Sequence, residues 1–226
     1  MKSAGPEREG TFQAPLGSAS RGRIVLVGGA SHLIIGADTS MDGLYRARFE
    51  ELAPEVQSEG STVTVRYPRL RPFDGACPEH PGEVVVNARV PWRIEFRGGV
   101  SRLANDLSGL ELDSFEVEGG ASRVELRLPK PSGIVPVRVL GGASNVTIYR
   151  PEGVAARLRV SGGVTNLSFD GQQFGVAGGE VSLQSTHYES APDHYDITIT
   201  GGANNLSVNS SGTRPDHPAC AGGPWI

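Results

Sequence analysis

The sequence predicts an all-β fold: a single-stranded, right-handed parallel β-helix, or β-solenoid, with rungs of 21–22 residues. The first observation is a Gly-Gly pair that begins at residues 28, 98, 119, 141, 162 and 201, within six segments of similar sequence. Four of these pairs follow one another at intervals of 21, 22 and 21 residues. The second observation is that the residues around all six pairs share one alternation of apolar and polar positions. A repeat of this length with common inward and outward positions is typical of stacked solenoid rungs.

The residues before each pair predict a half-buried strand. The positions four and two residues before the first glycine are apolar in all six copies, whereas the position between them varies, as in Glu95, Glu116 and Arg138. A period of two is the pattern of a strand with one face on a core. The twelve apolar residues are Ile24, Leu26, Ile94, Phe96, Phe115, Val117, Val137, Val139, Leu158, Val160, Ile197 and Ile199.

The residues after each pair predict a second strand. A small residue and a small polar residue come first, and two apolar positions follow. The first apolar position holds Leu33, Leu103, Val124, Val146, Leu167 and Leu206, and the second holds Ile35, Asn105, Leu126, Ile148, Phe169 and Val208. Asn105 is the exception, and a buried asparagine there needs hydrogen-bond partners. Each copy is therefore predicted as strand, Gly-Gly corner, strand.

We assign the glycines of the six pairs a structural role at this corner. The corner requires either a positive φ or an approach of two backbones too close for a side chain, and glycine satisfies both. One rung alone buries too little apolar surface to offset the entropy of ordering its chain, so the rungs must stack. An antiparallel β-sandwich would explain the alternation but not the identical positions at this spacing. The glycines are Gly28, Gly29, Gly98, Gly99, Gly119, Gly120, Gly141, Gly142, Gly162, Gly163, Gly201 and Gly202.

The repeats set the expected boundaries of one domain. Residues 1–20 are predicted as a flexible leader, residues 21–210 as the solenoid, and residues 211–226 as a tail or cap. Loop insertions are expected at about 68–83 and 186–196. No apolar run is long enough to span a membrane, and the first residues lack the apolar segment of a signal peptide. We therefore expect a soluble, cytoplasmic protein, or an extracytoplasmic one if a targeting segment has been removed.

Composition excludes several other classes. The chain has 226 residues, of which 31 are glycine, but glycine does not recur at every third position, so collagen is excluded. The formal net charge is −4, which argues against a nucleic-acid binder. No nucleophile motif, phosphate-binding loop or metalloprotease helix is present. We expect no enzyme activity and no cofactor.

Three segments carry a resemblance to a known family. They are the repeated GGAS-x-(L/V)-x-(L/I) units, SEGSTVTVRYPR at 58–69 and VPWRIEFRGG at 90–99. These segments resemble toastrack domains, which are adhesin-like β-solenoids related to the C-terminal domain of LiaF-type envelope-stress regulators. The resemblance covers roughly residues 21–210. It implies a non-enzymatic interaction or scaffold module in a bacterial signalling or stress-response system, with no catalytic motif to transfer.

Two other functions stay open from the sequence. The end rungs of a solenoid expose strand edges, and unprotected edges pair with other molecules, so a self-assembling structural polymer resembling bactofilin is one alternative. A carbohydrate-active β-helix enzyme is the second. The expected partner is another protein or a second copy of the chain. Carbohydrate is a possible ligand, and neither nucleic acid nor membrane insertion is expected.

Two sets of residues are candidates for binding. The loop at 186–196 concentrates imidazole and phenol groups in His187, Tyr188, His194 and Tyr195, which suit an acid/base site or a sugar-binding surface. The outward position between the apolar residues carries Arg138 and Arg159. A solvated loop and cross-strand ion pairs are the competing interpretation of both sets.

Two pairs of cysteine and histidine could form a metal site only if distant loops met. They are Cys77 with His80 and His217 with Cys220, which together offer a tetrahedral zinc set. A disulfide between the two cysteines is a further option. We expect two unrelated loop segments and no metal.

Overall fold

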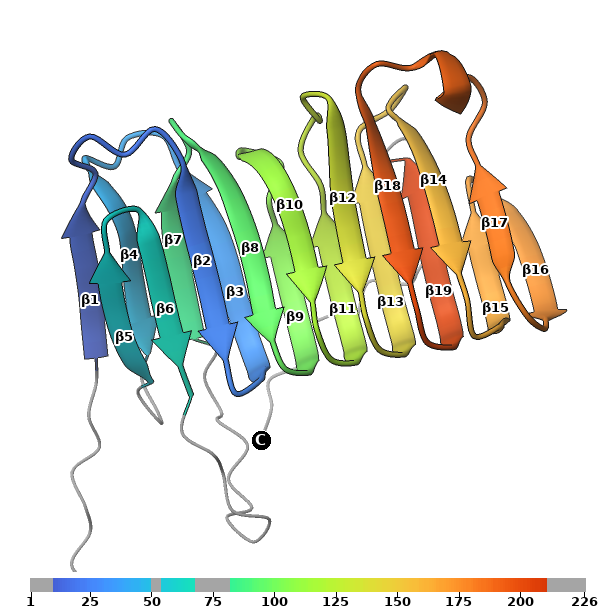
Figure 1. Ribbon diagram of the computed structural model, residues 1–226, viewed down its shortest axis with the longest axis horizontal. Coiled ribbons are helices and arrows are strands. Elements are labelled where there is room, and N and C mark those ends of the chain that lie inside the picture. Colours follow the sequence, from blue (N-terminus) through green and yellow to red (C-terminus); the bar gives the residue numbers. More distant parts are fainter. Residues whose placement is uncertain (1–9, 50–53, 68–81, 211–226) are drawn as a thin grey trace, which may run out of the picture.

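The structure is a computed structural model that describes residues 10–49, 54–67 and 82–210 (Figure 1). In these residues it contains strands and one short 3-10 helix, and the strands form two sheets around one apolar core. Every apolar residue at the four shared repeat positions is buried in that core. The predicted alternation and the all-β class are therefore confirmed.

Sheet A contains ten strands. In spatial order they are β1 (Gly10–Pro15), β4 (Gly43–Phe49), β7 (Gly82–Asn87), β3 (Ala30–Asp38), β9 (Val100–Asp106), β11 (Ala121–Arg127), β13 (Ala143–Arg150), β19 (Ala203–Ser210), β15 (Val164–Phe169) and β16 (Gln172–Ala177). Sheet B contains nine. They are β17 (Val181–Gln184), β14 (Ala155–Val160), β18 (His194–Ile199), β12 (Ile134–Val139), β10 (Glu111–Val117), β8 (Pro91–Arg97), β2 (Gly22–Val27), β6 (Thr62–Arg66) and β5 (Glu55–Glu59).

The interior of both sheets is parallel and in register, as the repeats predict. Val146 in β13 lies opposite Val124 in β11 and Leu206 in β19, so one repeat position forms a continuous row through the core. The ends differ, because β1, β4, β5, β16 and β17 each pair antiparallel with a neighbour. The molecule is thus two mostly parallel sheets that finish in antiparallel strands.

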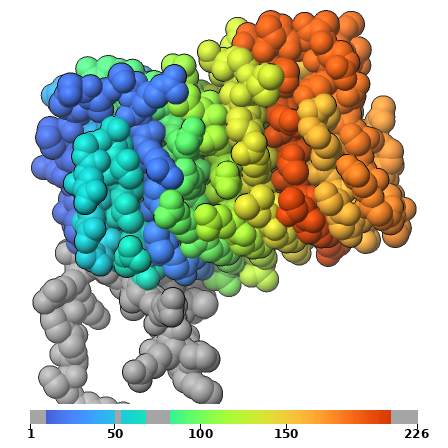
Figure 2. Space-filling view, in the orientation of Figure 1, coloured from blue at the N-terminus to red at the C-terminus, as the bar shows by residue number. Residues whose placement is uncertain are grey.

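The order of the rungs corrects the expectation of one uninterrupted coil. The last rung in sequence, β18 with β19, lies between the rung of β12 and β13 and the rung of β14 and β15. Figure 2 shows this as an orange-red band of β18 between the yellow-green of β12 and the amber of β14. The chain reverses direction after β15, at the end of the stack. Its last two strands, β18 and β19, then return to lie between two rungs that come earlier in the sequence.

The reversal has a local cause in a two-residue turn. Asp170 and Gly171 connect β15 to β16, and both have positive φ, 49° and 78°. An Asp-Gly pair of this kind favours a tight antiparallel hairpin. The segment GGEVSLQS at 178–185 resembles the repeat only in part, and it contains β17, an antiparallel edge strand on β14, in place of a further parallel rung.

Each repeat contains one left-handed residue after the glycine pair, and it explains why the first two buried positions of the second strand are three residues apart. Between the buried small residue and the first buried apolar residue lies one residue with φ of 53–56° in all six copies. Asparagine tolerates this backbone region better than most residues. The six residues are His32, Arg102, Arg123, Asn145, Asn166 and Asn205.

The predicted leader contains a strand. Residues 10–15 form β1, which pairs antiparallel with β4 at one end of sheet A. The half-buried Phe12 of β1 packs against Phe49 of β4, with ring centroids 6.2 Å apart. The loop predicted at 186–196 contains the 3-10 helix η1 (Tyr188–Ser190), and β18 begins at residue 194. Residues 211–226 lie outside the described residues.

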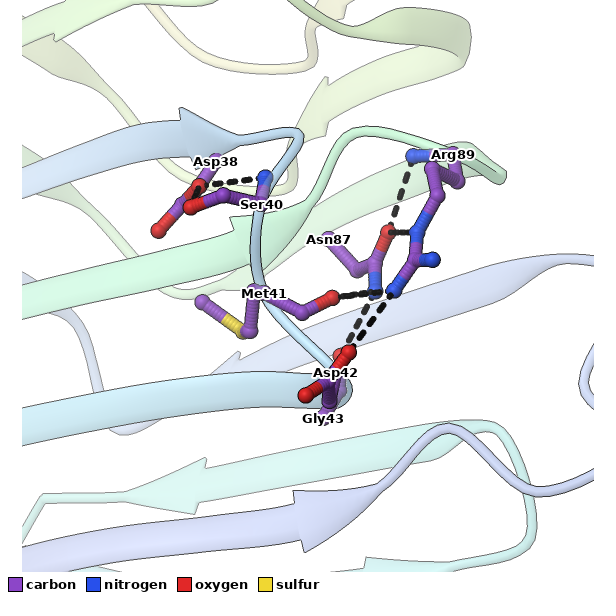
Figure 3. Close-up of polar contacts among 7 residues, drawn as sticks. All are labelled: Asp38, Ser40, Met41, Asp42, Gly43, Asn87 and Arg89. Atoms are coloured by element: carbon purple, nitrogen blue, oxygen red, sulfur yellow. Dashed lines mark hydrogen bonds and ion pairs between the residues drawn. The ribbon is translucent and has the colours of Figure 1, made fainter.

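A buried asparagine joins the loop between β3 and β4 to the end of β7 (Figure 3). The side-chain amide of Asn87 donates to the backbone carbonyls of Met41 and Gly43 at 2.9 and 2.7 Å. Its Oδ1 accepts from the backbone N–H and the guanidinium of Arg89, which also donates to the Met41 carbonyl. This network satisfies the polar groups of a turn that covers the end of the core.

Asn105 is the exception among the apolar repeat positions. We expect the protein to be more stable with this asparagine than with an apolar residue in its place. The side chain is 2 % exposed, and its Oδ1 accepts from the backbone N–H of Ile35 at 2.8 Å. The substitution Asn105→Leu would leave that N–H buried without a partner, but it would also remove Nδ2 of Asn105, which is itself buried with no hydrogen-bond partner among the described residues. We therefore expect a net loss of about 1 kcal/mol of unfolding free energy in urea titrations. The control is Leu126→Ile, a volume-conserving change at the neighbouring position. Equal or higher stability of the leucine variant would contradict this assignment.

Candidate functional site

The outer face of sheet B brings together three arginines from two strands, one in β12 and two in β14. Arg138 in β12 and Arg159 in β14 lie on either side of Thr198 in β18, so they occupy one row across three parallel strands. Arg157 lies two residues before Arg159 on the same face, beside Asp196 of β18. We call the surface formed by Arg138, Arg157, Arg159, Asp196 and Thr198 the arginine face.

Asp196 organises two of these arginines. Its Oδ2 accepts from Nη2 of Arg157 at 2.9 Å and from Nη2 of Arg159 at 3.1 Å. Arg138 is more loosely held, because its nearest carboxylate oxygen, on Glu116, lies 3.8 Å away. The side chain of Arg138 is 54 % exposed, so its guanidinium is available to a ligand.

The charge balance around Asp196 sets its pKa. Burial acts to raise the pKa of Asp196, but the hydrogen bonds and positive charges of Arg157 and Arg159 outweigh burial and hold it below the ordinary value. The opposite effect is seen in Arg157, whose pKa is raised by its hydrogen bond to Asp196. Asp196 and Arg157 therefore both carry their charges over the ordinary pH range.

We expect this ion pair to give the stability a defined pH dependence. A lowered carboxylate pKa stabilises the fold fully above the ordinary value near 3.8, and the effect is lost as pH falls through the folded pKa. The difference in unfolding free energy between wild type and Asp196→Asn should be constant from about pH 5 to 8 and should shrink below about pH 4. Urea titrations at each pH measure it. The control is Glu152→Gln, an exposed carboxylate before β14. A difference that does not change down to pH 3 would argue against the ion pair.

The loop before β18 packs onto this face through one aromatic ring. Tyr188 of η1 is 6 % exposed, with the Arg157 guanidinium 4.8 Å from its ring centroid and the His194 ring at 4.6 Å. The Nδ1 atom of His194 lies 2.8 Å from the carbonyl oxygen of Ala191. These contacts fix the loop against β14. His187 differs, since it is exposed and has a φ of 66°.

Tyr195 points away from the arginine face. Its ring is fully buried in the core, and its hydroxyl donates to the carbonyl of Pro129 at 2.7 Å. Burial also raises the pKa of Tyr195 well above the ordinary value for tyrosine. Among the four loop residues singled out from the sequence, only His187 is exposed to solvent, and Tyr188, His194 and Tyr195 are held by internal contacts.

Three residues of the arginine face, Arg157, Asp196 and Thr198, are not among the predicted binding residues. Thr198 lies at the same outward position as Arg159, and Arg157 and Asp196 lie at the outward position two residues earlier, so the alternation itself could have identified them. The possible zinc ligands Cys77, His80, His217 and Cys220 lie outside the described residues. Within residues 10–49, 54–67 and 82–210, no group of three or more His, Cys, Asp or Glu residues could hold a metal ion.

Comparisons with known proteins place this fold among characterised structures. A crystal structure of a candidate cell adhesion protein from Clostridium sporogenes matches with a TM-score of 0.67 and 17 % identity, covering 90 % of this chain and 99 % of that one. A candidate adhesin from Bacteroides fragilis has 7 % identity over 89 % of this chain and 96 % of its own, but its TM-score of 0.25 is too low to bear on the fold. No curated protein gives a significant match.

The described part of the chain contains no helix that is both long and apolar enough to cross a membrane.

A match to a family model identifies the family. The family model for the N-terminal domain of toast_rack, DUF2154, matches residues 3–149, which is more than half of the chain. The resemblance inferred from the Gly-Gly repeats is confirmed, and the chain belongs to the toast_rack N-terminal domain family.

Proposed function

We propose that this protein is a non-enzymatic interaction module that binds an acidic segment of a partner protein on the arginine face. The observation that carries the proposal is the row of Arg138 and Arg159 beside Arg157, with Asp196 alone between two of them. Arginine is enriched at protein interfaces, and its planar group binds carboxylates through two hydrogen bonds. The exposed Arg138 supplies the first contact for such a carboxylate.

The geometry reduces the cost of binding. Asp196 holds Arg157 and Arg159 in fixed positions, and Tyr188 packs against Arg157. Less conformational entropy is therefore lost when a partner orders this surface. A parallel sheet also presents its outward side chains at the regular strand spacing of about 4.8 Å, which suits an extended segment lying across the strands.

Site-specific crosslinking tests the proposal. A photoreactive benzoylphenylalanine at Thr198, in the native cells, should crosslink one protein that the same group at Ser122 on sheet A does not. The peptide crosslinked at Thr198 should be rich in Asp and Glu. Binding of that purified partner should weaken at least tenfold in Arg138→Glu/Arg159→Glu, and also with rising salt. The charge-matched control Arg102→Glu/Arg123→Glu, on the other sheet, should bind normally. Equal loss in both double variants, or crosslinks without an acidic segment, would contradict the proposal.

We further propose that the partner belongs to a bacterial signalling or stress-response system and that binding takes place in the cytoplasm. Family membership and the resemblance to envelope-stress regulators support the first part. The low cysteine content, two residues in 226, supports the second, because disulfides are common in extracytoplasmic domains and rare in cytoplasmic ones. Fractionation of native cells, followed by detection of the crosslinked pair in each fraction, tests both.

The free strand edges favour a second function, assembly into a structural polymer. Among the described strands, β1, β5, β16 and β17 each have a neighbour on one side only. Val176 in β16 is 82 % exposed, which makes this edge apolar as well as open. Light scattering on a size-exclusion column decides between the two functions. A particle of one mass near 23.8 kDa at all concentrations fits the interaction module, and rods that lengthen with concentration fit the polymer.

A further inference from the structure

We propose that the outer face of sheet A over β13, β19 and β15 is a binding site for neutral oligosaccharides. This surface faces away from the arginine face, because the two sheets enclose one core between them. The inference goes beyond the proposed function and depends on different residues.

Charge disappears from this face at β13. The left-handed position of the repeat holds arginine in β9 and β11, as Arg102 and Arg123, but asparagine in β13, β19 and β15. The next outward position changes in the same way, from Glu125 in β11 to threonine or serine in the three following strands. The structure therefore carries a continuous uncharged polar surface beside a charged one.

The three asparagines form a hydrogen-bonded ladder. Nδ2 of Asn166 donates to Oδ1 of Asn205 at 2.9 Å, and Nδ2 of Asn205 donates to Oδ1 of Asn145 at 2.9 Å. Nδ2 of Asn145 donates to Oγ of Ser144 at 3.2 Å. Each amide nitrogen has two hydrogens, so each keeps one N–H for a ligand, and all three side chains are exposed. The ladder holds these donors at strand spacing before any ligand arrives, which lowers the entropy lost on binding.

A shallow groove of about 640 Å³ runs along the ladder. Besides the three asparagines, its lining includes Thr147, Tyr149, Gln173 and the half-buried ring of Phe174. The Arg127 guanidinium lies 4.8 Å from the centroid of the Tyr149 ring and steadies it at the groove margin. The volume lies within the range of small-ligand sites.

The chemistry of the lining selects the ligand class. Amides and hydroxyls both donate and accept hydrogen bonds, as sugar hydroxyls do, and aromatic rings pack against the C–H groups of a sugar ring. No Asp, Glu, Lys or Arg is among the described residues that line the groove, so charge complementarity favours an uncharged ligand. An anionic glycan would instead be drawn to the arginines of β9 and β11. A short stretch of neutral polysaccharide fits the groove best.

Isothermal titration of the full chain tests this site. The probes are cellohexaose, chitohexaose and mannohexaose as neutral chains, and hexagalacturonate as the charged one. At least one neutral probe should bind, and more tightly than hexagalacturonate does. Asn205→Gly keeps the positive φ but removes the middle amide of the ladder, and should weaken binding by about five- to tenfold. Arg123→Gly makes the same backbone change outside the groove, and should leave the affinity within about twofold.

Several outcomes would overturn the proposal. They are no heat of binding with any neutral probe at millimolar concentration, equal or tighter binding of hexagalacturonate, or an Asn205→Gly variant that is folded by circular dichroism and binds as wild type does. The double variant Arg138→Glu/Arg159→Glu should bind the neutral probe normally. A failure of the oligosaccharide site can thus be distinguished from a failure of the arginine face.

Discussion

Replacing Val146 with aspartate is expected to leave the protein unfolded. Val146 is 3 % exposed and lies opposite Val124 and Leu206 in the core row of sheet A. Its neighbours in the core cluster are apolar, and the buried Arg150, four residues further along β13, is already paired with Asp170. A carboxylate at position 146 would therefore be unpaired, and burying an unpaired charge costs several kcal/mol or more. Domains of this kind have only about 5–15 kcal/mol of stability in total. Circular dichroism and thermal denaturation should show loss of the strand signal and of the cooperative transition.

Thr147→Asp is the matched control for this prediction. It adds the same charge one residue later in the same strand, where the side chain points outward and is partly exposed. We expect this variant to melt within a few degrees of the wild type, because water solvates the new carboxylate. If Val146→Asp also melted as the wild type does, this row could not be the core of the protein.

The second large effect is expected from Gly201→Ala at a corner of the stack. A Cβ placed on Gly201 would lie 2.6 Å from the backbone N of Gly142 and 2.7 Å from the carbonyl carbon of Gly141. Backbone atoms cannot move aside as a flexible side chain can, and Gly141 is itself packed against Gly119. We expect a loss of about 2–3 kcal/mol and a Tm lower by roughly 5–10 °C in thermal melts.

Alanine substitutions at two other glycines are the controls for this prediction. Gly175→Ala in β16 should be nearly neutral, since nothing lies within 4 Å of its added Cβ. Gly202→Ala should fall between the two, because its nearest neighbour is the carbonyl oxygen of Gly162 at 3.2 Å. Equal stability of all three variants would show that the rungs tolerate a wider separation at the corner than the structure has.

The corner shows how far the sequence alone could be interpreted. The glycine pairs left two explanations open, a positive φ or a close backbone approach. A positive φ occurs at Gly28, Gly29, Gly98 and Gly163. A close approach of two backbones occurs at the interior pairs, as at Gly141 and Gly201. The left-handed residue after each pair was missed, although Ala143 and Val146 are three positions apart and a plain strand would bury every second residue.

The order of the rungs could not be deduced in the same way. All six repeats present similar apolar rows, so any rung can pair with any other, and local pattern does not encode which neighbours meet. Only the Asp170–Gly171 pair pointed to a reversal of the chain. The right-handed sense of coiling stays a prediction.

For the candidate site, the alternation of apolar and polar positions predicted which side chains face outward better than the chemistry of the side chains did. It placed Arg138 and Arg159 outward, where they lie in one row. The same alternation puts Tyr195 two residues before the buried Ile197, and therefore inward. The imidazole and phenol groups of the loop suggested a ligand surface, but three of the four complete the packing around β14 and β18.

The inserted rung of β18 and β19 has a consequence for how the protein is made and how its gene can change. The ribosome delivers residues 194–210 after all the other described strands, so β12 and β14 wait for a common neighbour until translation of this domain is nearly complete. Repeat proteins commonly lengthen by duplicating a unit at one end. Here a unit duplicated after residue 210 would emerge beside β19, which already has β13 on one side and β15 on the other. A rung added after residue 210 would therefore find no unpaired strand edge beside β19, and it would have to reach an edge strand such as β16 or β17 to extend the stack.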